Sequence, residues 1–286
     1  MEQGVTPASP AILLRMFTAL AVVLALLPQS SPAFRAWNEP IEPFRVAGPL
    51  YYVGPKDITS LLVTTPAGHA LIDGGLEESA PIIIENVRKL GFRIEDVKIL
   101  LSTHAHADHA GGLARLKAAS GARLYAGAAD VDLLRRGGRG DFAFGDTLPF
   151  PAVEAGVAVR DGQEVALAGV RFRAIATPGH TKGCTSWTFT VEDGGVSRRV
   201  LMIGGLTAPG YRLVNNAGYP RIVEDFEGTF RTLRSLPADI VFEGHGFAFD
   251  LEARRQGKRP FVDPGALKQS VDKAEAAFRK ALQEQK

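Results

Sequence analysis

Cysteine is almost absent from this chain of 286 residues, since Cys184 is its only one. No intrachain disulfide can form, so the fold does not depend on covalent cross-links even if the chain is exported. The net charge of +2 gives no large excess of one sign. The arginine-containing stretch "RRGGRG" (residues 135–140, with Arg135, Arg136 and Arg139) is rich in glycine and predicts an exposed loop rather than a basic stripe. We therefore expect no nucleic-acid partner.

The chain also lacks an apolar run of the roughly 20 residues that span a bilayer. Its apolar run "MFTALAVVLALL" (Met16–Leu27) has 12 residues, follows Arg15, and precedes small residues at Ser31 and Ala33. This pattern is typical of a signal peptide cleaved after Ala33, and an uncleaved amino-terminal anchor is the alternative. We expect residues 1–33 to be a signal peptide, the mature chain to be periplasmic or secreted, and no membrane association after cleavage.

Histidine is scarce as well, yet three of the six histidines, together with Asp108, fall within "HAHADH" (His104–His109). Imidazole and carboxylate groups at such short spacing are typical of a site for a divalent metal. A strand would turn His109 away from the other three side chains, and a helix would leave out His106. We therefore predict an irregular turn around one ion or two. It follows a buried strand predicted at residues 97–102, so it lies where open α/β sheets place their sites.

Strands and helices alternate along the rest of the chain. Short strands separated by Gly and Pro turns are predicted first, at Tyr51–Val53, Ser60–Thr64 and His69–Asp73. A helix, the metal loop and further strands and helices follow, and a second group begins with a hairpin around Ala168 and Gly169. Strands followed by helices, twice over, indicate two sheets packed face to face with helices outside. We expect an α/β fold of this kind, a four-layer αββα sandwich, as a single domain over residues 34–286.

Two further histidines follow predicted strands, His180 in "TPGHT" and His245 in "EGHG". A lone histidine in a glycine loop is usually a surface residue, but two such loops beside a dense cluster favour convergence on one site. The set divides into three histidines for one ion, and an aspartate with two histidines for another. Three neutral imidazoles and a solvent molecule form a catalytic zinc site. His69 is left over and is expected to be a turn or surface residue.

With these three motifs at these distances, the chain resembles the metallo-β-lactamase superfamily. Flanking stretches such as "LLVTTPAGHALIDGG", "ATPGHTKGCTSWTF" and "LTAPGYRL" are similar to subclass B3 β-lactamases. The resemblance implies the αββα fold and a zinc-dependent hydrolase that opens the β-lactam ring of antibiotics, and so confers resistance. It implies a small-molecule β-lactam as partner and a monomer. The implied ligands are His104, His106 and His180 for the first zinc, and Asp108, His109 and His245 for the second.

The resemblance also implies roles in catalysis. A metal-bound hydroxide between the ions attacks the lactam carbonyl, and Asp108 orients that hydroxide. Thr207 is similar to a position where B3 enzymes offer a hydroxyl to the substrate carboxylate, and a loop-capping threonine is the alternative. Asp73 could accept a hydrogen bond from a ligand imidazole, and a structural turn aspartate is the alternative.

Gly205 departs from the family pattern. B3 enzymes commonly have a serine in this loop, and lactonases and glyoxalase II enzymes carry a metal-bridging aspartate there. Glycine has no side chain to hold a metal or its water, so we expect the second zinc to bind more weakly than the first. The alternatives for function are another hydrolase on the same fold, such as an acyl-homoserine lactonase, and a zinc-binding protein without catalysis.

Overall fold

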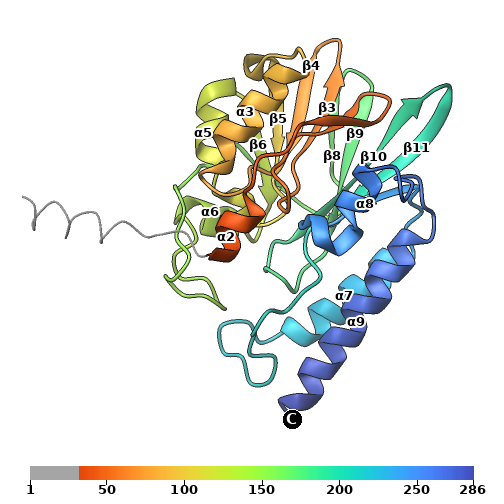
Figure 1. The fold of residues 1–286 in the computed structure, drawn as a ribbon. Helices are drawn as coiled ribbons and strands as arrows, with labels where there is room; N and C mark the ends of the chain where they lie inside the picture. The colour runs from red at the N-terminus through yellow and green to blue at the C-terminus, as the bar shows by residue number, and fades with distance from the viewer. Residues whose placement is uncertain (1–31) are drawn as a thin grey trace, which may run out of the picture. The chain divides into compact units, whose positions relative to one another are not determined.

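Two β-sheets packed face to face form the centre of the computed structural model, which describes residues 32–286 (Figure 1). The described part begins with helix α2 (Pro32–Trp37), and residues Ala36–Lys286 form one compact unit that contains both sheets. The predicted signal peptide lies almost wholly outside the described residues and stays a prediction. Within residues 32–286, no helix is both long and apolar enough to cross a membrane.

The first sheet has seven strands, and neighbours in the sheet are also neighbours in sequence. Strands β1 to β4 pair antiparallel through short turns, whereas β4 to β7 run parallel, because helices carry the chain back between β4 and β5 and between β5 and β6. The strands are β1 (Phe44–Ala47), β2 (Leu50–Tyr52), β3 (Leu61–Thr65), β4 (Gly68–Ile72), β5 (Val97–Leu101), β6 (Arg123–Gly127) and β7 (Val157–Val159).

The second sheet has five strands in the order β12-β11-β10-β9-β8. Its strands are β8 (Glu164–Leu167), β9 (Val170–Ala176), β10 (Thr185–Asp193), β11 (Val196–Met202) and β12 (Ile240–Phe242). The hairpin predicted between β8 and β9 is confirmed. Ala168 and Gly169 both have positive φ, as a two-residue turn requires when it follows the twist of the strands.

Helices cover the outer face of each sheet, which confirms the predicted αββα sandwich. Helices α3 (Ser79–Lys89), α5 (Leu113–Ser120) and α6 (Val131–Arg135) pack on the first sheet, and α7 (Ile222–Arg234) and α9 (Ala266–Glu284) pack on the second. The remaining helices are α4 (Ala107–Ala110), α8 (Leu251–Arg255) and the 3-10 helices η1 (Ile94–Asp96) and η2 (Gly246–Phe249).

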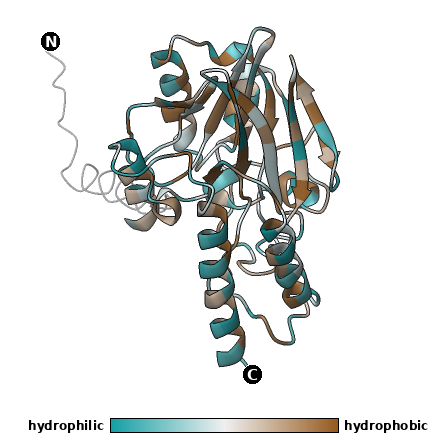
Figure 2. Ribbon diagram, turned by 90° about the vertical axis from the view of Figure 1, so that its right-hand side faces the viewer, coloured by the Kyte–Doolittle hydropathy of each residue, from teal (hydrophilic) through white to brown (hydrophobic). Residues whose placement is uncertain are grey.

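An apolar core fills the space between the two sheets, where the strands are largely hydrophobic (Figure 2). Trp187 of β10 is fully buried there, and its Nε1–H donates a hydrogen bond of 3.0 Å to the carbonyl of Ser102, just after β5. This bond ties the second sheet to the first at the end of the strand that leads into the histidine cluster. Burial of the core thus also fixes where that cluster begins.

Two features differ from expectation. Strands β1 and β7, the two edge strands of the first sheet, were not predicted. The expectation that His69 is a turn or surface residue was wrong. It lies inside β4 and is 8% exposed. Its ring packs edge to face with the Phe92 ring, and the two ring centroids are 5.0 Å apart. Pairing of β4 with strands on both sides buries a residue that looked like part of a turn.

Candidate metal centre

The six predicted ligand residues come together in the structure. "HAHADH" begins three residues after β5, His180 follows β9 and His245 follows β12, so all three loops leave the carboxyl end of a strand. The motif is not irregular throughout, because Asp108 and His109 lie on the single turn of α4. The extended backbone up to His106 and the helical turn after it place side chains on one side that a strand or a helix alone would point apart.

His104, His106 and His180 form the tighter group. One potential ligand atom from each lies within 4.8 Å of the others, and His106 Nδ1 is 3.1 Å from His180 Nε2. The Nε2 atom of His104 is buried without a hydrogen-bond partner. Burial lowers the pKa of His104 far below its ordinary value, and burial beside His106 lowers the pKa of His180 to about 3. Neutral imidazoles with lone pairs turned toward one another fit a cation between them.

Asp108 is the centre of the second group. Its Oδ2 lies 3.3 Å from Nε2 of His245 and 3.7 Å from Nε2 of His109. Burial opposes the charge on Asp108, but the imidazoles of His109 and His245 outweigh it and hold the pKa of this carboxyl well below its usual range. His104, Asp108 and His109 also lie within 4.8 Å of one another, so the two groups adjoin. The side chains of Asp108 and His245 are 18% and 23% exposed, which makes this half more open to solvent.

Two of the five histidines, His180 and His245, contact a backbone carbonyl on the other side of the ring. The Nδ1 atom of His180 lies 2.7 Å from the carbonyl of Thr207, and Nδ1 of His245 lies 3.0 Å from the carbonyl of Asp57. A carbonyl can only accept, so each Nδ1 carries the proton and leaves Nε2 free to bind a metal. Backbone carbonyls leave no mark in a sequence, so neither contact could be predicted.

Asp73 lies beside two of the candidate ligand histidines, His104 and His109. Its carboxylate accepts hydrogen bonds from the Thr103 amide at 2.7 Å and the Thr103 hydroxyl at 2.6 Å, and lies 3.4 Å from Nδ1 of His109. Because the Thr103 hydroxyl donates to Asp73, its oxygen accepts from Nδ1 of His104 at 3.1 Å. Asp73 has φ of 60°, a left-handed conformation that costs energy in a non-glycine residue. This one carboxylate therefore holds His104 through the Thr103 hydroxyl and faces the ring of His109.

Asp130 is a residue of this site that sequence reasoning missed. Its carboxylate accepts hydrogen bonds from the Ala105 amide at 3.0 Å, the Thr181 hydroxyl at 2.6 Å and the Gly183 amide at 2.7 Å. Burial raises its pKa, against these three hydrogen bonds. An aspartate just before a helix reads as an N-cap, but this side chain makes no capping bond to α6. It joins the loop of His104 and His106 to the loop of His180 instead.

Glycines lie directly against two of the imidazoles. A methyl group on Gly205 would lie 2.6 Å from Cδ2 of His180, and one on Gly244 would lie 2.7 Å from Cε1 of His109. Thr207, two residues after Gly205, is exposed, and of its atoms it is the backbone oxygen that contacts His180. The His180 ring therefore occupies the space that a side chain at position 205 would need.

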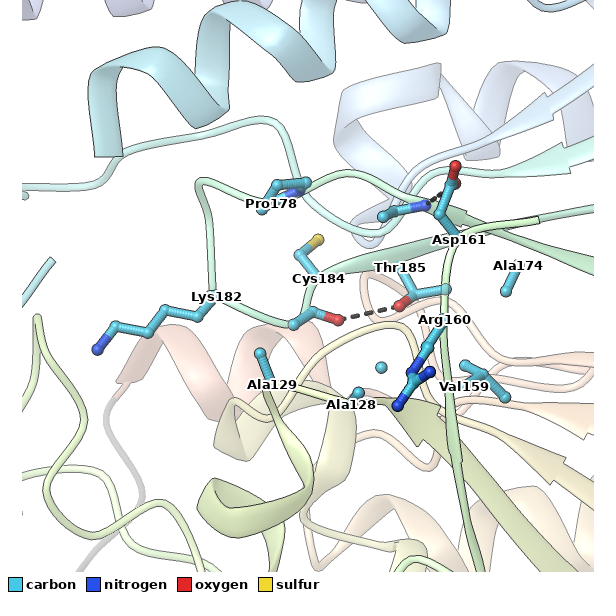
Figure 3. A pocket seen from close by; sticks show the side chains of 13 residues that line it. Ala128, Ala129, Val159, Arg160, Asp161, Ala174, Pro178, Lys182, Cys184 and Thr185 are labelled. Carbon is cyan, nitrogen blue, oxygen red and sulfur yellow. Dashed lines mark hydrogen bonds between the residues drawn. The ribbon is translucent and has the colours of Figure 1, made fainter. Parts of the chain in front are cut away.

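A cavity of about 240 Å³ lies behind the His180 loop (Figure 3). Small side chains such as Ala128 and Cys184 line it together with the charged residues Arg160, Asp161 and Lys182, and none of the six predicted ligands is among its lining residues. The Cys184 thiol is buried, and burial raises its pKa above the ordinary value. The one thiol at this cavity is therefore not an activated nucleophile.

The family model of the metallo-beta-lactamase superfamily matches residues 53–245. The chain belongs to this superfamily. The match begins at the end of β2 and ends at His245, so it contains all six predicted ligands. The resemblance stated from the sequence motifs is confirmed.

Solved structures with the superfamily fold resemble the chain over most of its length. A metallo-beta-lactamase of Cronobacter sakazakii is 43% identical with a TM-score of 0.85, covering 88% of this chain and 98% of that one. FEZ-1 of Legionella gormanii is 38% identical with a TM-score of 0.84, covering 87% and 98%. BJP-1 of Bradyrhizobium japonicum, a subclass B3 metallo-beta-lactamase, is 36% identical with a TM-score of 0.83, covering 88% and 98%.

Curated relatives include hydroxyacylglutathione hydrolases. That of Rhodospirillum rubrum is 29% identical over 202 residues, which are 66% of this chain and 64% of the relative. That of Methylococcus capsulatus is 29% identical, with 69% and 65% covered. The chain thus spans less than two thirds of the length of these relatives, whereas it covers nearly all of the metallo-beta-lactamases of known structure.

The Cronobacter structure is described by a HARLDQ motif. Compared letter by letter, "HAHADH" has histidines at the third and sixth positions, where that motif has Arg and Gln. His106 and His109 give this chain two imidazoles that such a motif does not contain.

Proposed function

We propose that the protein hydrolyses the β-lactam ring of antibiotics with two zinc ions bound at the histidine cluster. The observation that carries the proposal is that all six candidate ligands come together at the carboxyl ends of the strands. The chain is also 36% to 43% identical to metallo-beta-lactamases along nearly their whole length. In this proposal His104, His106 and His180 hold the first ion, and Asp108, His109 and His245 hold the second.

Bound zinc would supply a water molecule acidified to a pKa of about 7 and would polarise the lactam carbonyl. Hydrolysis would add one water molecule across the amide C–N bond, leaving a carboxylate at the carbonyl carbon and an N–H at the former lactam nitrogen. Asp108, held ionised by His109 and His245, accepts a hydrogen bond from the attacking water and so orients it. Thr207 is exposed beside the His180 loop and is proposed to offer its hydroxyl to the substrate carboxylate.

Thioester hydrolysis, as the names of the curated relatives suggest, is the second candidate. The loop after β11 argues against it and against lactone hydrolysis, since both activities go with a metal-bridging aspartate in this loop. A side chain at Gly204 would lie 2.6 Å from Sγ of Cys184, and one at Gly205 would lie 2.6 Å from His180. No carboxylate fits at either position without displacing a neighbour, so lactam hydrolysis is favoured.

Three substrates separate the candidates. Purified zinc-loaded protein is assayed with a chromogenic cephalosporin, an S-acyl glutathione and an acyl-homoserine lactone, beside a His180→Ala variant. We expect ring opening of the cephalosporin only, and its loss in the variant. Turnover of only the thioester or the lactone would contradict the proposal, and turnover of none would indicate a zinc-binding protein without catalysis.

We also propose that residues 1–33 direct export and are removed, and that the mature protein is a periplasmic or secreted monomer. The support is the short apolar run after Arg15 and the small residues before Phe34. Expression in a Gram-negative host, fractionation and mass measurement test this. A mature chain that begins at Phe34 in the periplasmic fraction is expected, and a full-length chain in the membrane fraction would contradict it.

A further inference from the structure

The loop that follows α6 brings an aspartate against the metal cluster. Residues 140–146, "GDFAFGD", fold back on themselves, with backbone hydrogen bonds in both directions between Asp141 and Gly145. Asp141 is 8% exposed. Its Oδ2 lies 3.7 Å from Nε2 of His106, and both atoms are buried without a hydrogen-bond partner among the described residues. Two orphaned polar atoms that face each other require an explanation.

The rest of the loop holds this carboxylate in place. Its other oxygen, Oδ1, accepts hydrogen bonds from the amides of Ala143 at 2.8 Å and Phe144 at 2.9 Å. The Phe144 ring meets the edge of the His106 ring, with centroids 5.2 Å apart. The loop thus fixes one carboxylate oxygen, aims the second at His106, and packs an aromatic ring on the same imidazole.

The other nitrogen of His106 explains the pairing. Its Nδ1 faces His180 Nε2 at 3.1 Å, inside the group proposed to hold the first zinc. An imidazole that binds a metal through Nδ1 carries its proton on Nε2, which becomes a donor. The distance to Asp141 has to shorten by only about 0.8 Å to form a charge-assisted hydrogen bond.

We propose that Asp141 is a positioning residue for the first metal site, accepting the Nε2 proton of His106 and fixing that ring with Nδ1 toward the ion. Asp141 does for His106 what the carbonyls of Thr207 and Asp57 do for His180 and His245. Like Asp73, it lies outside the three histidine motifs, and it comes from the loop that follows α6. The inference rests on the proposed function only in that a metal binds His106.

Asp141→Asn separates this role from simple support of the loop. Asparagine keeps an oxygen for the amides of Ala143 and Phe144 but presents an uncharged amide to His106. We expect the dissociation constant for the first zinc, measured on metal-stripped protein against a chromophoric chelator, to rise about 10-fold or more. Asp146→Asn is the matched control, because Asp146 accepts only the Gly140 amide in the same loop, and its zinc affinity should equal that of the wild type.

A measurement on the wild-type protein keeps the inference testable if the variant does not fold. In a long-range ¹H–¹⁵N spectrum of the zinc-loaded protein, Nε2 of His106 should be protonated, with its proton downfield and slow to exchange. A zinc affinity of Asp141→Asn equal to wild type, or an Nε2 proton that exchanges like that of a free imidazole, would overturn the inference. Neither readout uses a β-lactam. The inference about Asp141 can therefore be tested even if the protein binds zinc but does not hydrolyse β-lactams.

Discussion

Gly205 lies against the imidazole of His180, so closely that a methyl group in place of its hydrogen would be 2.6 Å from Cδ2 of that ring. The absence of a side chain here is therefore more than the loss of a possible ligand. It is also a condition for the position of His180, one of the three histidines of the first group.

Gly205→Ser is expected to reduce activity, although serine is common at this position in B3 enzymes. The new Cβ forces His180 to move by a fraction of an ångström or more, and displacement of a metal ligand on that scale costs about 10- to 100-fold in kcat/KM. The measurements are kcat/KM for a cephalosporin and the zinc affinity. Gly228→Ser, in open space on α7, is the control. Equal or higher activity in Gly205→Ser would show that the position of His180 does not depend on a glycine at position 205.

Asp130→Ala should destabilise the protein and weaken its metal site together. The substitution leaves the amides of Ala105 and Gly183 and the hydroxyl of Thr181 without their acceptor, at a total cost of about 3 kcal/mol or more. Chemical denaturation of metal-stripped protein gives the stability, and zinc titration gives the affinity. Asp132→Ala is the control, because Asp132 is exposed in the adjoining helix and pairs only with surface arginines. Normal zinc affinity in Asp130→Ala would limit its role to the fold.

Removal of metal should abolish hydrolysis and lower the melting temperature, because neutral buried imidazoles then face one another without a cation. On addition of zinc, we expect the rate to continue rising after the first equivalent is bound. The second group is the more exposed half of the site, and Gly205 adds no ligand there. Rate and bound zinc are followed in the same titration. A rate that saturates at one equivalent per chain would count against a weaker second site.

Asp239 provides a test of pH dependence away from the metal. Hydrogen bonds from the side chain and amide of Arg199 lower the pKa of Asp239 to about 2 from its ordinary value of 3.8. Since the folded-state pKa is the lower one, the unfolded chain binds more protons in this range. The stabilisation is present above about pH 4 and is lost as the pH falls toward 2.

Asp239→Asn should therefore cost about 1 kcal/mol at pH 7, after allowance for solvent screening of the partly exposed pair. The difference from wild type should shrink as the pH falls from about 4 to about 2. Denaturation of metal-stripped protein excludes the effect of metal release. A difference that does not change with pH would mean that the ion pair between β11 and the start of β12 contributes nothing through its charge.

The sequence by itself determined the layer order and the identity of the candidate ligands. Alternation of strands and helices is local, and it gave the two sheets and the helices outside them. Histidine is so scarce in this chain that a cluster at His104–His109 and two glycine loops at His180 and His245 stood out. The one-turn helix α4 inside the cluster escaped notice, because four residues show no helical period.

Tertiary structure alone decided how those ligands are held. The carbonyls of Thr207 and Asp57 are backbone atoms that any residue would supply, and Asp130 and Asp141 look like an ordinary helix cap and an ordinary loop aspartate. His69 became a core residue because β4 is paired on both sides. These roles depend on distances between segments far apart in the chain, and no local pattern of residue types records such distances.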